Sequence, residues 1–233
     1  MVNMLTKMGG EELIRKILSG EKDFSFVKLK DGFNLNSHNR YGELQTYLKS
    51  QDLEENPLII SNAEMIYLQA NGIFLPFLIG KKANLTGATL GNVSLLEANL
   101  AGANLEGAYL AKVDLEDANL SEANLSRVNL WKTNLAGSDL SNSKLLEAKI
   151  LGTNLTEATL YGANLTKATL EGANLAGANL INAVFEGANL AGARNLEQAI
   201  DLKKARFSNT KISAGQEKIL YCTYRDERFI LQE

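Results

Sequence analysis

Cysteine and histidine are almost missing from this chain of 233 residues, which contains one of each, Cys222 and His38. A single cysteine excludes an internal disulfide framework and a metal site built from several thiolates. A single histidine excludes histidine-rich metal sites and most catalytic triads, which use an imidazole base. We therefore expect no bound metal and no cofactor.

Familiar catalytic motifs are lacking as well. The sequence has no G-x-S-x-G, GxxxxGK(S/T), HExxH or paired CxxC. His38 lies in the polar stretch NLNSHNRYG and is interpreted as a hydrogen-bonding residue, while Cys222 is interpreted as a small buried residue. The chain is predicted not to be an enzyme and to have no catalytic residues, with a ligand pocket near His38 as the alternative.

The chain also lacks an excess of positive charge and any long apolar run. The formal net charge is -3 and the isoelectric point is about 5.4, so direct nucleic-acid binding is not expected. No segment approaches eighteen continuous apolar residues, and the N-terminus lacks an apolar core followed by a cleavage site. We expect a cytoplasmic protein that does not enter a membrane.

What the sequence does contain is a five-residue period, seen clearly in ATLEGANLAGANL, residues 168–180. Neither a helix, with a period near 3.6, nor a strand, with a period of 2, fits it. In 22 consecutive pentads the centre is leucine from Leu85 to Leu190, except for Ile150 and Phe185. The residue two places before each centre, the entry residue, is always Ala, Val, Thr or Ser. Entry and centre residues are both predicted to face a tightly packed interior.

The remaining positions suggest turns. Asn stands between the entry residue and the centre in 12 of the 22 pentads, and Gly stands two places after the centre in 10. Both residue types tolerate turn dihedrals, so we expect them to mark corners. One pentad cannot bury its own leucine, and stability therefore requires stacking into an all-β solenoid with a continuous core.

The run ANLAGANLEGAYL, residues 98–110, resembles the A(D/N)LXX consensus of the pentapeptide-repeat family. Some members of that family come from cyanobacteria. The resemblance implies a right-handed quadrilateral β-helix with four pentads in each coil. It also implies a homodimer through the C-terminal end, as in relatives. At about 4.8 Å per stacked strand, the 22 pentads would rise roughly 26 Å.

Three regions are predicted along the chain. Residues 1–56 read as a small, mainly helical N-terminal cap, because EELIRKILSG and RYGELQTYLKSQ each place apolar residues on one helical face. Residues 57–212 are predicted to form the β-helix, which is regular over 83–192 and degenerate at both ends. At its C-terminal end the period breaks at ARNLEQAID and resumes two residues out of frame with Leu202, Phe207 and Ile212. Residues 213–233 form a C-terminal cap or tail. In the degenerate part, the outward residues Phe74, Pro76, Phe77 and Ile79 are expected to be covered by the N-terminal cap.

Candidate binding residues follow from stacking residues 20 apart. Two adjacent faces, centred on Leu95 and Leu100 and their repeats, carry seven carboxylates and no Lys or Arg: Glu97, Asp114, Glu116, Asp117, Glu122, Asp139 and Glu157. Asp114, Glu116 and Asp117 are expected to be outward and solvated. Apolar side chains are expected to be exposed in two stacked pairs, Trp131 with Leu151 and Tyr161 with Ile181. Exposed aromatic residues beside charge are typical of a protein-binding surface.

Two functions fit this surface. The first is a non-enzymatic, regulatory scaffold that presents a rigid surface to a protein partner of unknown identity. The alternative is a DNA mimic that modulates a topoisomerase, as the resemblance to gyrase-protecting members of the family implies. The regular region has eleven carboxylates against six cations, a net charge of only -5, and it has no obvious loop between coils. These features favour the scaffold.

Overall fold

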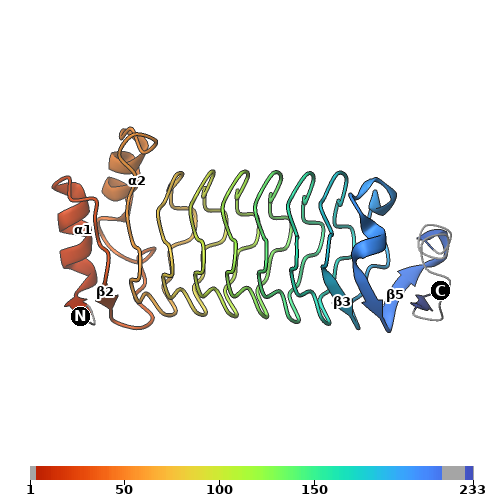
Figure 1. The fold of residues 1–233 in the computed structure, drawn as a ribbon. Coiled ribbons are helices and arrows are strands. Elements are labelled where there is room, and N and C mark those ends of the chain that lie inside the picture. The colour runs from red at the N-terminus through yellow and green to blue at the C-terminus, as the bar shows by residue number, and fades with distance from the viewer. Residues whose placement is uncertain (1–3, 217–228, 233) are drawn as a thin grey trace.

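The computed structural model describes residues 4–216 and 229–232, and the chain forms an elongated column with both helices at its N-terminal end (Figure 1). Cys222 and most of the predicted C-terminal cap lie outside the described residues. The described elements follow in chain order: β1 (Thr6–Met8), α1 (Gly10–Leu18), β2 (Val27–Leu29), α2 (Tyr41–Lys49), β3 (Val184–Glu186), η1 (Leu196–Gln198), η2 (Leu202–Lys204), β4 (Arg206–Ser208), β5 (Thr210–Ser213), η3 (Ala214–Gln216) and β6 (Phe229–Gln232).

Each pentad is a short straight segment followed by a turn. The entry and centre residues of all 22 regular pentads are buried, which confirms the inward assignment. The residue between them, the bridge position, forms parallel β-bridges with residues 20 before and 20 after it, as Asn104 does with Asn84 and Asn124. Four pentads therefore complete one coil, and every coil adds one layer to a shared apolar core.

The turn has one feature that every regular pentad shares. In the pentad of Leu105, the carbonyl of Leu105 accepts a hydrogen bond from Ala108 N at 3.0 Å, and Gly107 between them has φ of +66°. Positive φ at the third residue, with a negative one before it, defines a type II β-turn. The corresponding residue has positive φ in all regular pentads, whether it is glycine, asparagine or a charged residue.

The twelve asparagines between an entry and a centre residue do not form the corners, where the sequence pattern placed them together with glycine. They occupy the bridge position on the flat face, and Asn92, Asn142 and Asn182 are the regular-pentad asparagines that take the turn position itself. Asn104 Oδ1 accepts a hydrogen bond from Glu106 N at 3.2 Å, and Asn129 Oδ1 accepts one from Trp131 N at 3.0 Å. An asparagine at the bridge position thus satisfies a turn amide without adopting the turn dihedrals itself.

The column has four faces, which we number by their pentads. Face 1 holds the pentads centred on Leu85 and every twentieth residue after it, and faces 2, 3 and 4 begin in the same way with Leu90, Leu95 and Leu100. Successive coils are joined by backbone hydrogen bonds that run along the column axis. Leu105 N, for example, donates to Asn124 O at 2.8 Å, and Asn124 N donates to Ala103 O at 2.9 Å.

The N-terminal region begins the column as well as closing it. β1 pairs in parallel with β2, and Asp23, Lys28 and Asn34 form bridges with Ile59, Glu64 and Gln69 on faces 4, 1 and 2. The segment predicted as a mainly helical cap therefore also contains three faces of a first coil. Residues Leu13, Ile14 and Ile17 of α1 are buried in the same core, which they close at its open end.

On face 3 of this first coil, helix α2 takes the place of a strand. Gln45 Nε2 donates to Gly72 O, and Gln45 Oε1 accepts from Phe74 N at 3.0 Å. Tyr41 OH donates to Asn71 O at 2.7 Å. The side-chain amide of Gln45 thus reproduces the paired hydrogen bonds that a strand would make. Of the residues expected to be covered, Pro76 is buried, while Phe74, Phe77 and Ile79 are half-buried.

The last coil is longer than the others by two residues. Asn195 and Asp201 are each inserted between a bridge position and a centre, and both adopt left-handed φ, +58° and +53°. Bridges consequently span 21 residues at Asn179–Ile200 and 22 residues between β3 and β4. Leu202, Phe207 and Ile212 return to buried centre positions, which confirms the shifted frame expected there. Beyond them, β5 pairs in parallel with β6.

Candidate interaction surface

The acidic residues on faces 3 and 4 occupy several distinct positions. Three of them, Glu97, Asp117 and Glu157, stand at the same turn position of face 3 in different coils, with φ of +53°, +55° and +59°. All three are exposed, and exposed Glu116 precedes Asp117 in the same turn. We call these four carboxylates the acidic corner, which separates face 3 from face 4.

The backbone of the acidic corner is held on both sides by the column. Glu97 N donates to Glu116 O at 2.9 Å, Asp117 N donates to Ala136 O at 2.9 Å, and Glu157 N donates to Ala176 O at 2.8 Å. The carboxylates therefore rise from fixed points about 4.8 Å apart per coil. Within residues 4–216 and 229–232, none of the four forms an ion pair.

The other three predicted carboxylates lie elsewhere. Asp114 and Asp139 occupy bridge positions and are half-buried, so Asp114 is less solvated than the exposed Glu116 and Asp117 with which it was grouped. Asp114 Oδ1 accepts from Asn134 Nδ2 at 3.1 Å, and Asp139 Oδ1 accepts from Ser141 N at 2.9 Å, because a bridge residue lies flat between neighbouring coils. Glu122 is exposed but stands at the corner between faces 4 and 1.

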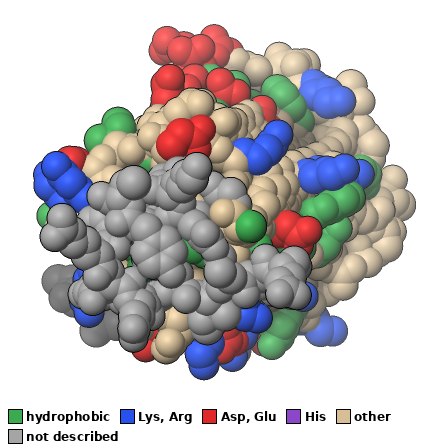
Figure 2. All heavy atoms as spheres, turned by 90° about the vertical axis from the view of Figure 1, so that its right-hand side faces the viewer, with side chains coloured by type: hydrophobic (Ala, Val, Ile, Leu, Met, Phe, Trp, Pro, Cys, Tyr) green, Lys and Arg blue, Asp and Glu red, His purple; other side chains and the backbone are tan. Residues whose placement is uncertain are grey.

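Charge is distributed unevenly around the column. Figure 2, which looks along the column from the C-terminal end, shows the largest group of acidic side chains at the top, and Lys and Arg side chains at the right, bottom and left with a few acidic ones among them. In the regular coils, one of the four carboxylates on the side formed by faces 1 and 2 has a cationic partner, whereas Glu147, Glu171 and Glu186 form no ion pair among the described residues. Glu106 pairs there with Arg127, and Asn124 Nδ2 donates to the same carboxylate at 3.2 Å.

Trp131 stands at the corner between faces 2 and 3, on the opposite edge of face 3 from the acidic corner. Its side chain is 37% exposed, and its ring centroid lies 5.2 Å from Lys112 Nζ and 4.8 Å from Lys132 Nζ. Both distances permit cation–π attraction. Leu151, one coil further on, is half-buried rather than exposed as expected. We call Trp131, Leu151 and these two lysines the tryptophan corner.

The second predicted apolar pair lies at a third corner, between faces 4 and 1. Tyr161 is 43% exposed, whereas Ile181 is half-buried because it stacks in the same column of turn residues. Gly162 N donates to Ile181 O at 2.9 Å, which fixes the two turns side by side. The column therefore brings Trp131 together with Leu151 and Tyr161 together with Ile181, but it separates both pairs from the acidic corner.

Two exposed tyrosines were missed by the sequence analysis. Tyr109 is 42% exposed at a bridge position of face 2, and Tyr67 is 56% exposed. Each ring lies over a glycine, since a Cβ added at Gly91 would stand 2.9 Å from Tyr109 Cε1 and one at Gly87 would stand 2.4 Å from Tyr67. The signal was available in the sequence: an aromatic residue at an outward position beside a glycine one coil away.

The polar groups of the N-terminal region form structural contacts. His38 Nδ1 accepts from Arg40 N at 3.2 Å, and His38 Nε2 lies 2.7 Å from a carboxylate oxygen of Glu11, so the imidazole ties the loop before α2 to α1. Burial raises the pKa of Tyr41, and the hydrogen bond that Lys28 donates to Glu64, together with the attraction between the two charges, raises the pKa of Lys28. In the described part of the chain no cluster of His, Cys, Asp or Glu could hold a metal, and no helix is long and apolar enough to cross a membrane.

Comparison with known proteins gives a family match and several matches to solved structures. A family model described as pentapeptide repeats matches in eight copies, over residues 81–117, 123–162 and 158–213. No curated protein matches.

Among solved structures, HetL, a pentapeptide repeat protein involved in heterocyst differentiation regulation in the cyanobacterium Nostoc sp. strain PCC 7120, is 24% identical. The match covers 87% of this chain and 96% of HetL, with a TM-score of 0.32. The pentapeptide repeat protein Rfr23 of the cyanobacterium Cyanothece 51142 is 26% identical over 66% of this chain and 93% of its own, with a TM-score of 0.23. A trypsin-treated variant of QnrB1, a plasmid-mediated fluoroquinolone resistance protein, is 19% identical over 62% and 81%, with a TM-score of 0.42.

Proposed function

This chain belongs to the pentapeptide-repeat family, whose model matches more than half of its residues, and from that membership we propose that it is a non-enzymatic scaffold whose outer surface binds a protein partner. The scaffold is regulatory in this proposal, and it acts in the cytoplasm of a cyanobacterium. Its coils have the right-handed quadrilateral form of the family. Association of two copies through the C-terminal end is a further part of the proposal.

The acidic corner is the observation that carries the proposal. Its four carboxylates are exposed on a backbone fixed by coil-to-coil hydrogen bonds, and they form no ion pair within the described ranges. A rigid surface loses little conformational entropy when a partner binds, so more of the interaction energy remains as affinity. The chemistry that complements this corner is a partner surface rich in Lys and Arg.

Charge density distinguishes a protein partner from the DNA-mimic alternative. Duplex DNA carries one negative charge per about 1.7 Å, or roughly 15 charges over the roughly 26 Å of the regular column. The regular region has a net charge of -5, from eleven carboxylates against six cations. Its density is therefore about one third of that of the duplex, and this difference favours the scaffold over mimicry of DNA.

The test is affinity capture of the tagged protein at two salt concentrations, with partners identified by mass spectrometry. The variant combines Glu97→Gln, Asp117→Asn and Glu157→Gln, which neutralise the three carboxylates of the acidic corner that share one turn position. The matched control combines Glu147→Gln, Glu171→Gln and Glu186→Gln, which remove the same charge from faces 1 and 2. Exposed charge pairs contribute about 0.2–1 kcal/mol each, so three lost contacts should weaken binding by roughly 3- to 150-fold.

A stoichiometric partner that is lost at high salt and with the acidic variant, but kept with the control, supports the proposal. Equal retention by both variants contradicts a role for the acidic corner. Combined substitution of Trp131 and Leu151 by glutamate then tests the tryptophan corner as the contact, because it would place charge into the apolar part of that surface. Topoisomerase subunits as the captured partner, with inhibition of gyrase supercoiling, would favour the alternative.

A further inference from the structure

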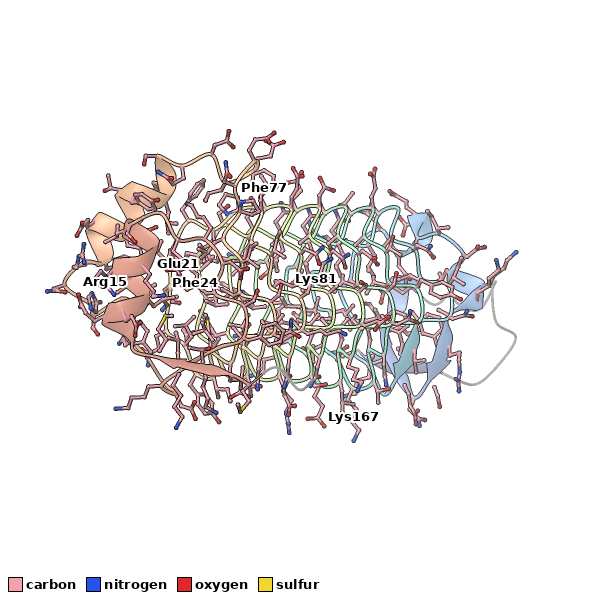
Figure 3. The ribbon with its side chains drawn as sticks, turned by 60° about the vertical axis from the view of Figure 1, so that its left-hand side comes forward. Arg15, Glu21, Phe24, Phe77, Lys81 and Lys167 are labelled. Atoms are coloured by element: carbon pink, nitrogen blue, oxygen red, sulfur yellow. The ribbon has the colours of Figure 1, made fainter. Side chains whose placement is uncertain are left out.

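An apolar cavity of about 70 Å³ lies inside the N-terminal end of the column. Helices α1 and α2 form part of its wall through Ile14, Ile17, Leu44 and Leu48, and the coils form the rest through residues such as Ile60 and Leu100. Figure 3 shows Phe24, another lining residue, beside α1 where the helix meets the first coils. Every residue that lines the cavity is apolar.

The cavity results from two departures from the repeat. In the degenerate coil, the centre positions that would hold large side chains are occupied by Ala70 and Gly80, whereas all 22 regular centres are Leu, Ile or Phe. Neighbouring side chains fill part of the missing volume. A Cβ added at Gly80 would stand 2.9 Å from Leu100 Cδ2 and 3.3 Å from Ile60 Cγ1, so side chains one coil away on either side lean into the position. The remaining space is the cavity.

The cavity has room for water but nothing to hold it. A water molecule needs a cavity of roughly 10–15 Å³ and two to four polar partners. This cavity satisfies the first condition, since its volume is about 70 Å³, but its lining offers no polar side chain. An apolar cavity of this kind stays dry and accepts an apolar guest, as a larger one of about 150 Å³ accepts benzene or xenon.

We propose that this cavity is a binding site for a small nonpolar molecule of about three or four non-hydrogen atoms, such as a nonpolar gas or a short hydrocarbon. A guest there restores contacts that the missing leucine side chains would have made. Because α1 and α2 contribute the wall on one side, the guest binds only while both helices are docked on the coils. By mass action, binding then stabilises the docked helices relative to any state in which they have separated from the column.

The test uses xenon as the probe, on the full chain with labelled methyl groups, followed by NMR as the gas pressure is raised. We expect saturable shifts at the methyl groups of Ile14, Ile17 and Ile60, and no comparable shift at those of Leu135 and Leu155 deep in the regular column. Hydrogen exchange of the α1 amides should slow as the xenon shifts saturate. Shifts of similar size throughout the core, shifts that do not saturate, or a bound water signal in the cavity would overturn the proposal.

Variants separate the cavity from general core effects. Ala70→Leu fills the site and should reduce the saturable shift at Ile60 at least tenfold, whereas Ala101→Leu adds the same atoms at a half-buried turn residue and should leave the shift unchanged. If Ala70→Leu prevents folding, Leu85→Ala, which enlarges the same cavity, should bind benzene with saturable shifts that the unmodified chain lacks. Unchanged xenon shifts in a folded Ala70→Leu variant, or no gain of benzene binding in Leu85→Ala, would refute the assignment.

Discussion

Replacing Leu135 by alanine tests the packing of the column most directly. Leu135 is buried on face 3, with Leu115 and Leu155 stacked on either side of it. Leu115 N donates to Asn134 O at 2.8 Å, and Leu135 N donates to Asn154 O at 2.8 Å, so hydrogen bonds fix the coil spacing on both sides. Large-to-small substitutions of this kind cost about 2–5 kcal/mol, and the cost rises with the cavity that remains. Because the coils cannot move together, we expect a loss in the upper half of that range, about 4 kcal/mol.

The measurement is urea unfolding followed by far-ultraviolet circular dichroism, with thermal unfolding as a second readout. For a domain of this size, about 4 kcal/mol corresponds to a fall of roughly 8–16 °C in the melting temperature. The control is Leu146→Ala, because Leu146 is 39% exposed and should cost less than about 1 kcal/mol. A loss below about 1 kcal/mol for Leu135→Ala, with the denaturant slope unchanged, would refute the conclusion that the coil spacing prevents collapse.

The other predictions concern the N-terminal region and the turns. Gln45→Ala leaves Gly72 O and Phe74 N without their side-chain partner. The free energy of unfolding should fall by about 1–3 kcal/mol, and hydrogen exchange at Phe74 should become faster. Unchanged exchange at Phe74 would contradict the role assigned to Gln45. Gly107→Ala should lower the free energy of unfolding by about 1–2 kcal/mol, as measured by urea unfolding. The loss would come from backbone strain at φ of +66° alone, since no atom outside the neighbouring residues lies within 4 Å of the added Cβ. Burial lowers the pKa of Lys22 below 10.5, so between the lowered pKa and 10.5 the unfolded chain binds more protons and stability rises with pH. Lys22→Met should remove the contribution of Lys22 to the rise in stability between pH 7 and pH 10. Identical profiles of stability against pH in the two proteins would exclude that contribution.

The five-residue period was enough to predict the column, because entry and centre residues can be buried together only if coils stack. Leu202, Phe207 and Ile212 even revealed the two-residue shift of the last coil, since a shifted apolar frame still requires inward positions. The corner position predicted for the asparagines between entry and centre residues was wrong for a physical reason. Tolerance of turn dihedrals does not show that a residue adopts them, and here the asparagine side chain serves the turn from the neighbouring flat position.

Other features depend on contacts that no local pattern contains. The amide of Gln45 can substitute for a strand only because α2 lies against face 3. The apolar pattern of the two amphipathic helices does not predict which face of the column they pack against. Trp131 was identified from its outward position, but its two lysine neighbours come from different coils. The sequence was enough to predict that carboxylates gather on two adjacent faces. It did not show that Asp114 and Asp139 lie apart from the acidic corner, because that requires knowing which positions form bridges and which form turns.

The direction of the coil-to-coil hydrogen bonds has a mechanical consequence. Because these bonds run along the column axis on all four faces, a force that pulls the two ends apart loads the junctions between coils one after another. A released coil of 20 residues would lengthen from a rise of about 4.8 Å to a contour of roughly 66–72 Å. The force–extension curve of a single stretched molecule should therefore show a sawtooth of nearly equal steps. The column would unfold one coil at a time rather than in a single event.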